Sequence, residues 1–401
     1  MLASSRIKDG SLAAAISDSE IAWLRHVTPI TEHYCRQVAR QDHRGKRLAC
    51  WMHVRFNTIP WTLALAESGA EIVVGACNVD STDDVAAAYL AERGITLFAW
   101  RGMSRAEYEE NKHLVRAFDA DYLCDMGGEL SEAYLDREPA ITGALEATTS
   151  GLNRLHDRKI PFPVFDWNSI PLKDRLENRF HVGNEVWPVF SHITSMSLYG
   201  RSVLVVGYGP VGKGIAERAR ALGASVHVAD LDPVRLIEAQ HHGCMPVDLE
   251  EGLIRCQIVV TATGVEGVLG ENQLQQARPE AILFNAGHSN REIDIEWLYR
   301  QPHQDMRPHV ERFDLDGREI FLLARGSLLN LAAEAGGGTG LDLFDLYTAV
   351  MLRGISWMFD GGAETALSGL QPYPAELEAE IARLWVQVRG DDALSEATDH
   401  L

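Results

Sequence analysis

The feature that most constrains the fold of this chain is residues 203–230, VLVVGYGPVGKGIAERARALGASVHVAD. An apolar, β-branched run leads into a turn containing Gly207, Gly209 and Gly212, a helical segment follows, and SVHVAD has the pattern of a second strand. The first glycine permits a tight turn, the second lets the backbone approach a pyrophosphate, and the third allows close helix packing. Since the N-terminus of the following helix faces the anion, the pattern predicts a dinucleotide-binding crossover.

Asp230 ends the second strand of this crossover. A carboxylate at that position accepts hydrogen bonds from ribose hydroxyls and repels a 2′-phosphate, so NAD is expected rather than NADP. Arg235 is close in sequence and favours the opposite choice, because a cation accommodates a 2′-phosphate. The alternative is a glycine turn without a nucleotide, and the strand and helix on either side of the turn count against it.

The alternation of strands and helices predicts an α/β protein with two doubly wound parallel-sheet domains. AEIVVGACNV, ITLFAW, DADYLCDMGG and FPVFDWN are expected strands of a first, substrate and catalytic domain over residues 1–182. Residues 183–339 form the expected Rossmann NAD-binding domain. The helical segments within 340–401 are expected to complete the first domain, and their return to the cofactor domain is the alternative.

Composition narrows the classes of partner. The 401 residues include 37 basic and 57 acidic side chains, a formal charge of −20 that disfavours nucleic acid and anionic membrane surfaces. There is no apolar run of transmembrane length and no secretion-signal pattern at the start. The six cysteines have no metal-ligand spacing, so reduced thiols in a cytoplasmic protein without a metal site are expected.

Short segments along most of the chain resemble those of one known enzyme family. GAEIVVGACNVDSTDDVAAA, MGGELS, ATTSG, NSIPLKDRLEN, GYGPVGKG, NAGHSNREIDIEWL and LLNLA occur in the same order as in S-adenosylhomocysteine hydrolases, over residues from about 45 to 375. The resemblance implies a nucleoside substrate and tightly bound NAD. In that family the ribose 3′-hydroxyl is oxidised, which acidifies the C4′ proton. A base removes this proton, the 5′ thiol leaves, water adds, and the hydride returns.

The resemblance also implies roles for individual residues. Lys173 falls on the lysine that polarises the 3′-hydroxyl, and His53 on the histidine that serves water or the leaving group. His288 falls on the histidine beside the nicotinamide, and Glu177 on a catalytic aspartate four residues after the lysine. The expected cofactor contacts are Thr148, Thr149, Ser150, Asn178, Gly207, Gly209, Pro210, Val211, Gly212, Asp230, Arg235, Thr263, Gly287 and Asn330.

The substrate half departs from the family pattern. Asp125 is followed by Met126 where the family has a second carboxylate, and Ala147 replaces a glutamate. Arg55 replaces a threonine, and Gly337 stands where the family has a histidine near the adenosine. Exchanging several contacts of this kind is expected to change substrate preference.

The final residues, GDDALSEATDHL, lack the Lys- and Tyr-bearing tail that family members insert into a neighbour's NAD site. A homo-oligomer, dimer or tetramer, is still expected.

Several functions fit these observations. The first is hydrolysis of S-adenosylhomocysteine, the family default. The second is the same 3′-oxidation and elimination on another nucleoside, as in a 5′-dehydratase or lyase. A regulatory relative without turnover is disfavoured because Lys173, His53 and His288 are kept. The alternative of an ordinary alcohol dehydrogenase with exchangeable NAD is supported only by the lack of the Lys- and Tyr-bearing tail.

Overall fold

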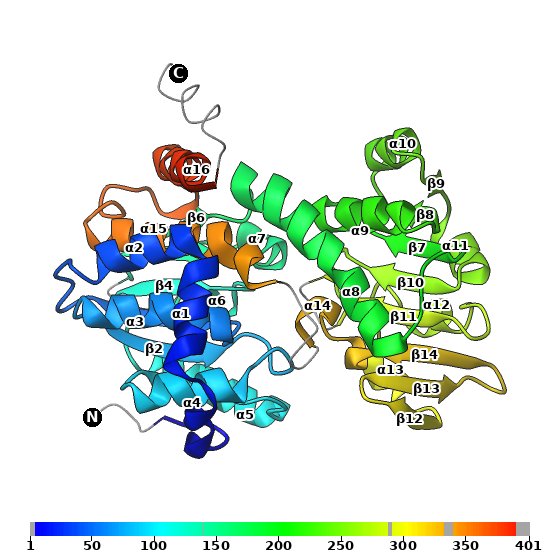
Figure 1. Cartoon of the computed structure of the whole chain (residues 1–401), viewed down its shortest axis with the longest axis horizontal. Coiled ribbons are helices and arrows are strands. Elements are labelled where there is room, and N and C mark those ends of the chain that lie inside the picture. Colours follow the sequence, from blue (N-terminus) through cyan, green and yellow to red (C-terminus); the bar gives the residue numbers. More distant parts are fainter. Residues whose placement is uncertain (1–4, 139, 288–290, 333–339, 390–401) are drawn as a thin grey trace. The chain divides into compact units, whose positions relative to one another are not determined.

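The structure, a computed structural model, describes residues 5–138, 140–287, 291–332 and 340–389. It divides into two compact units: unit 1 holds Met1–Lys173 with Leu341–Leu401, and unit 2 holds Asp174–Gly340. Each unit is built around one sheet with helices against it, which confirms the α/β class (Figure 1). The division falls inside helix η3 (Leu172–Val182), and the boundary predicted from the sequence lies at the end of the same helix.

Unit 1 contains a seven-stranded sheet in the order β15-β6-β5-β4-β1-β2-β3, and all of its pairings are parallel. Its strands are β1 (Arg47–Met52), β2 (Glu71–Ala76), β3 (Thr96–Phe98), β4 (Tyr122–Asp125), β5 (Gly143–Glu146), β6 (Pro163–Asp166) and β15 (Gly369–Pro372). The last strand comes from the C-terminal part of the chain and pairs with β6 at the edge.

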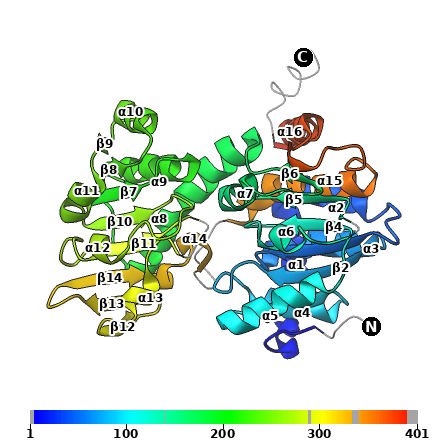
Figure 2. The same cartoon turned by 180° about the vertical axis from the view of Figure 1, so that it is seen from behind.

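Both faces of this sheet are covered. Successive side chains of a strand point to opposite faces, and in β1 Leu48, Cys50 and Met52 join one apolar cluster whereas Ala49 and Trp51 join another. The first cluster is closed by α2 (Pro29–Val38), α3 (Ile59–Glu67), α4 (Asp84–Glu92) and α15 (Asp345–Phe359). The second is closed by α5 (Arg105–Arg116), α6 (Glu129–Ala133) and α7 (Thr149–His156), which Figure 2 shows from behind. This explains why the strands are apolar runs without polar alternation.

Two helices of unit 1 begin at a capping box that is visible in the sequence. Ser17 with Glu20 and Ser104 with Glu107 form capping boxes at α1 and α5. The helices are η1 (Gly10–Ala15), α1 (Asp18–Val27), α2 (Pro29–Val38), η2 (Phe56–Thr58), α3 (Ile59–Glu67), α4 (Asp84–Glu92), α5 (Arg105–Arg116), α6 (Glu129–Ala133), α7 (Thr149–His156), η5 (Leu341–Phe344), α15 (Asp345–Phe359) and α16 (Ala375–Arg389).

Unit 2 contains an eight-stranded sheet in the order β12-β13-β14-β11-β10-β7-β8-β9, parallel except for the β12-β13-β14 edge. Its strands are β7 (Ser202–Val206), β8 (Ser225–Ala229), β9 (Met245–Pro246), β10 (Ile258–Thr261), β11 (Ile282–Asn285), β12 (His303–Arg307), β13 (Val310–Asp314) and β14 (Glu319–Leu323). Its helices are α8 (Gly183–Thr194), α9 (Pro210–Ala221), α10 (Pro233–His241), α11 (Leu249–Arg255), α12 (Glu271–Leu274), α13 (Ile295–Leu298), η4 (Ala324–Gly326) and α14 (Leu329–Ala332).

Among strands β1–β6 of unit 1 and β7–β11 of unit 2, the chain reverses its direction of growth at one point in each. In unit 1 the chain runs from β1 to β2 and β3 and then returns to place β4 beside β1. In unit 2 it runs from β7 to β8 and β9 and then returns to place β10 beside β7. Ligands of open α/β sheets bind at the carboxyl ends of the strands at such a switch point, so each unit offers one candidate location.

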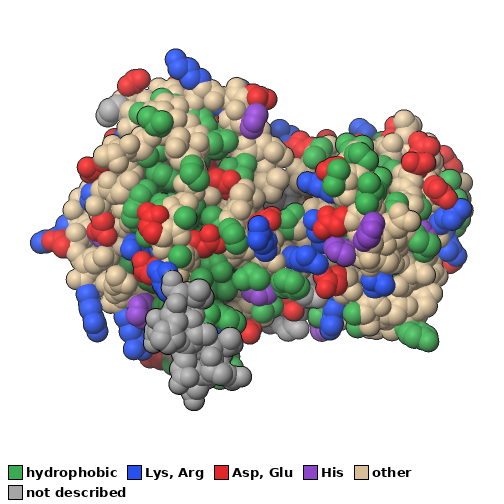
Figure 3. Space-filling model, turned by 90° about the horizontal axis from the view of Figure 1, so that it is seen from above, with side chains coloured by type: hydrophobic (Ala, Val, Ile, Leu, Met, Phe, Trp, Pro, Cys, Tyr) green, Lys and Arg blue, Asp and Glu red, His purple; other side chains and the backbone are tan. Residues whose placement is uncertain are grey.

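The surface carries charges of both signs. Figure 3 shows acidic and basic side chains interspersed over the face that it draws, with apolar side chains between them. Among the described residues, none of the helices combines the length and the apolar character needed to cross a bilayer.

Candidate active site

His53 follows β1 at the switch point of unit 1. Its Nδ1 lies 2.6 Å from Oγ of Ser81, and that hydroxyl lies 3.3 Å from the carbonyl oxygen of Asn78. When Ser81 donates to this carbonyl, it accepts from Nδ1–H, and the lone pair of the imidazole is then on Nε2. The arrangement orients the ring and prepares Nε2 to accept a proton.

Arg55 lies two residues further on, before helix η2. Its Nη1 donates to the carbonyl oxygen of Ser81 at 3.4 Å. Burial lowers the pKa of the Arg55 guanidinium, while the carboxylate of Asp83 opposes this shift. A cation therefore lies close to the residue that orients His53.

Asp125 and Glu146 end the neighbouring strands β4 and β5, are paired in register, and are fully buried. Burial raises the pKa of Asp125 to about 6; burial, followed by the charge of Asp125, raises that of Glu146 to about 8. Glu146 accepts hydrogen bonds from the backbone N–H groups of Gly127 (3.1 Å), Gly128 (2.9 Å) and Thr148 (2.8 Å). Asp125 accepts from the backbone N–H of Ser131 at 2.6 Å. Both carboxyls therefore hold backbone groups of the segments that follow β4 and β5.

Met126 and Ala147 come directly after these two carboxyls and are also buried. The Sδ atom of Met126 lies 3.3 Å from the hydroxyl oxygen of Tyr347 in α15. The two departures noted in the sequence therefore lie side by side at the ends of adjacent strands, and both are apolar.

Thr148, Thr149 and Ser150 lie at the start of α7. The Thr148 hydroxyl oxygen accepts from the Gly151 N–H (2.9 Å) and is 3.1 Å from that of Ser150, and the Asn168 side-chain amide donates to that of Thr149 (3.1 Å). The triplet thus presents hydroxyls and helix-start N–H groups together, which suits a polar ligand.

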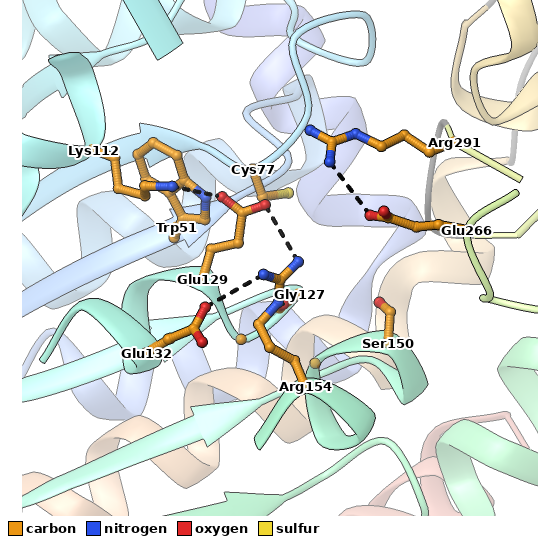
Figure 4. A network of polar contacts seen from close by, with 12 residues as sticks. Trp51, Cys77, Lys112, Gly127, Glu129, Glu132, Ser150, Arg154, Glu266 and Arg291 are labelled. Carbon is orange, nitrogen blue, oxygen red and sulfur yellow. Dashed lines mark hydrogen bonds and ion pairs between the residues drawn. The ribbon is translucent and has the colours of Figure 1, made fainter. Parts of the chain in front are cut away.

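A network of charges that lies outside every sequence motif holds the glycine loop after β4 (Figure 4). Arg154 of α7 donates from Nε to the Gly127 carbonyl oxygen at 2.9 Å and lies 3.6 Å from Glu129. Glu129 also contacts Lys112 at 3.0 Å and accepts from the Tyr108 hydroxyl at 3.1 Å. Because these partners come from α5, α6 and α7, which are separate in sequence, local patterns contain no signal for them. In unit 2, Figure 4 also marks the ion pair of Arg291 with Glu266, at 3.5 Å.

Lys173 lies in the first turn of η3, which is a π-helix. Its Nζ lies 4.9 Å from the ring centroid of Tyr347. In a π-helix each N–H bonds to the carbonyl five residues back, which widens the turn, so residues four and five apart share one face. Lys173, Glu177 and Asn178 therefore project from one face of this helix, which an α-helix does not arrange for residues five apart.

The glycine turn of unit 2 follows β7 as predicted. Gly207 has φ of +95°, which favours glycine, and a Cβ on Gly212 would overlap the carbonyl oxygen of Gly207. A Cβ placed on Gly209 would meet nothing within 4 Å, so space is open above the start of α9. Pro210 occupies the first turn of this twelve-residue helix, and its free N-terminal N–H groups fit a pyrophosphate.

Asp230 follows β8 and is nearly buried, with its side chain 7% exposed. Its two carboxylate oxygens accept from the N–H groups of Tyr208 (2.6 Å) and Asp232 (2.8 Å). Arg235 lies 3.5 Å from the same carboxylate. The carboxylate is thus held rigidly beside the glycine turn, with lone pairs left for ribose hydroxyls.

Thr263 and Gly287 follow β10 and β11 and are organised by a buried residue, Glu292, that the sequence did not single out. Glu292 accepts from the N–H groups of Thr263 (2.9 Å) and Gly264 (2.6 Å), and burial raises its pKa. The Gly287 N–H donates to the side-chain oxygen of Asn285 at 2.8 Å. The loops after β10 and β11 lie at the same carboxyl edge of the sheet as the glycine turn after β7.

Of the remaining predicted positions, two lie in helices of unit 2 and two fall outside the described residues. Asn330 is buried in α14 of unit 2, and Val211 follows Pro210 in α9. His288 and Gly337 lie outside the described residues.

The chain matches two family models. Residues 7–138 match S-adenosyl-L-homocysteine hydrolase, and residues 181–336 match the NAD binding domain of S-adenosyl-L-homocysteine hydrolase. It is similar to an S-inosyl-L-homocysteine hydrolase of Methanothermobacter thermautotrophicus, with 32% identity over 397 residues that cover 96% of this chain and 94% of the relative. It is also similar to an adenosylhomocysteinase of Thermococcus kodakarensis, with 32% identity over 393 residues covering 94% and 92%.

Proposed function

The chain belongs to the S-adenosyl-L-homocysteine hydrolase family and uses NAD, and from that premise we propose that it oxidises the ribose 3′-hydroxyl of a nucleoside, removes the C4′ proton and eliminates the 5′ substituent. The observation that carries the proposal is the placement of His53 and Lys173. His53 follows a strand at the switch point of unit 1, with one ring nitrogen held by Ser81, and Lys173 lies against Tyr347. Both are proton carriers of the kind that this chemistry needs.

Lys173 accepts the proton of the 3′-hydroxyl in this proposal. His53, through Nε2, gives a proton to the leaving 5′ group or takes one from water. Glu177 and Asn178 share the helical face of Lys173, and Glu177 is 4% exposed.

NAD, when bound, takes the C3′ hydride and later returns it. The N–H groups that start α9 hold its pyrophosphate, and Asp230 accepts from its ribose hydroxyls. Thr263 and the Thr148–Ser150 triplet supply further hydroxyls to the cofactor. The proposal also assigns Asn330 to the cofactor, together with His288, which lies outside the described residues.

The substrate default is S-adenosylhomocysteine. Relatives that carry the name S-inosyl-L-homocysteine hydrolase make the hypoxanthine analogue an equal choice to test. One observation favours a second candidate, elimination without hydration on another nucleoside. Met126 and Ala147 place apolar side chains at two strand ends where the family pattern has carboxylates. Fewer groups are then able to bind and activate a water molecule.

The test offers the purified enzyme S-adenosylhomocysteine, S-inosylhomocysteine and nucleosides with a free 5′-hydroxyl. Thiol release, C4′=C5′ alkene and bound NADH absorbance are recorded separately. Release of homocysteine with deuterium at C4′ in heavy water supports the hydrolase, and alkene accumulation supports the second candidate. Absence of bound NADH with every nucleoside contradicts both.

Lys173→Met supplies the matched variant for this test. It is expected to fold and bind NAD as the unmutated protein does, because the side chain keeps its length and apolar stem. It is expected to form no bound NADH when a nucleoside is added. Normal NADH absorbance in this variant removes Lys173 from the proposed chemistry.

A further inference from the structure

Tyr347, the third residue of α15, contacts two residues that matter for the proposed chemistry, Lys173 and Met126. Its ring centroid lies 4.9 Å from Nζ of Lys173. Its hydroxyl oxygen lies 3.3 Å from Sδ of Met126. All of these residues belong to unit 1. Tyr347 therefore touches both the amine that accepts a proton and the strand end where the nucleoside pocket departs from the family pattern.

Packing fixes the direction in which the ring faces. Trp167, fully buried after β6, lies with its ring centroid 4.8 Å from that of Tyr347 at an interplanar angle of 39°. Phe344 meets the ring edge to face at 6.2 Å. With Trp167, Phe344 and Met126 around it, the ring has little freedom to turn away from Lys173.

We propose that Tyr347 is a positioning residue for Lys173, whose ring face holds the amine and stabilises the ammonium that forms during 3′-oxidation. This inference rests on the proposed function. In that step the O–H bond of the 3′-hydroxyl breaks and an N–H bond forms on Nζ, while the C3′–H electron pair leaves as hydride to NAD and C3′=O forms. Positive charge thus develops on Nζ against the negative face of the ring, which is the geometry of a cation–π contact.

Variants that separate the ring from the hydroxyl test the proposal. Tyr347→Leu removes the ring face, Tyr347→Phe keeps it, and Tyr199→Leu, which removes an exposed aromatic ring of unit 2, is the control. In single-turnover mixing, Tyr347→Leu is expected to form bound NADH about tenfold more slowly, the effect of a partly desolvated cation–π contact. Tyr347→Phe is expected to keep the rate of the unmutated protein, and Tyr199→Leu to leave it unchanged. Nucleoside affinity, measured by calorimetry, is expected to change less than the rate.

A second measurement does not depend on turnover. The protein without nucleoside is treated with acetic anhydride, and mass spectrometry follows acetylation of Lys173 relative to the exposed Lys159. Loss of the ring is expected to raise labelling of Lys173 severalfold in Tyr347→Leu and in Tyr347→Met, which serves if the Leu variant does not fold. Tyr347→Phe is expected to match the unmutated protein.

The two results distinguish failure of the inference from failure of the proposed function. If the unmutated protein forms no NADH but labelling follows the presence of the ring, the function is wrong and the contact stands. If NADH forms in the unmutated protein and both rate and labelling are the same in Tyr347→Leu, Tyr347 does not position Lys173.

Discussion

Two buried carboxyls, Asp125 and Glu146, make stability depend on pH. The pKa of Asp125 is raised to about 6 and that of Glu146 to about 8, so the native state binds more protons than the unfolded chain between about pH 4 and pH 8. The free energy of unfolding is therefore expected to fall as pH rises through this window, by at most about 1.4 kcal/mol per pH unit for each proton. Urea unfolding between pH 5 and pH 9 measures it.

Asp125→Asn is expected to make this dependence shallower, because it removes one titrating group and the charge that helps to raise the pKa of Glu146. Asp157→Asn, at an exposed site, is the control. A slope that is the same in all three proteins contradicts the assignment.

Asp230 is expected to decide between NAD and NADP. Asp230→Ala removes a carboxylate held by two backbone N–H groups, so NAD binding is expected to weaken by about 1–3 kcal/mol. Arg235→Leu is the companion variant, and it is expected to widen the preference for NAD. Titration with both cofactors measures each effect, and equal affinity of the unmutated protein for NAD and NADP excludes this role.

Gly151, the third residue of helix α7, lies where a side chain would not fit. A Cβ on Gly151 would overlap the carboxylate of Glu146, and this carboxylate binds both glycines of the β4 loop and Thr148. Gly151→Ala is expected to cost about 1–3 kcal/mol of unfolding free energy through overpacking. Gly10→Ala, where a Cβ meets nothing within 4 Å, is the control. Equal denaturation midpoints in the two variants run against this reading of the loop.

The sequence predicted those elements whose signal is local. The apolar strands β2, β3, β4, β6, β7 and β8, the helix α9 and the turn with Gly207 all lie where their patterns place them. Strand β15 and the β12-β13 edge were not predicted, because their pairing depends on partners distant in sequence or on an antiparallel hairpin without a strong apolar pattern. The π-winding of η3 has no local signal either.

The same distinction separates the predicted part of the candidate site from the rest. Residues within motifs, such as Asp230 and Lys173, follow from the sequence. Glu292 and Arg154 were not predicted, because their importance comes from backbone groups of other loops that only the folded chain brings to them. Tyr347 was missed for the same reason.

For the whole molecule, the two switch points predict two stages of protection in hydrogen exchange. NAD alone is expected to slow exchange at the start of α9 and at Thr148–Ser150, which the proposal assigns to the cofactor. Addition of a nucleoside is then expected to protect the segment after β1, around His53. Exchange followed by mass spectrometry measures both stages. Protection around His53 by NAD alone, or none at Thr148–Ser150, contradicts this division of roles.

The position of β15 has a consequence for how the protein is made. Strand β6 is complete once residue 166 has been synthesised, but the strand that covers its outer edge spans Gly369–Pro372, and α15 closes the same core from Asp345 onward. At ~5–20 residues per second, about 10 to 40 s pass between the two. During that time the ribosome delivers all of unit 2, which has every strand of its own sheet. The later-made unit is thus the first able to finish folding, while the earlier one waits with an open edge and an uncovered apolar face, the state in which a nascent chain most needs a chaperone.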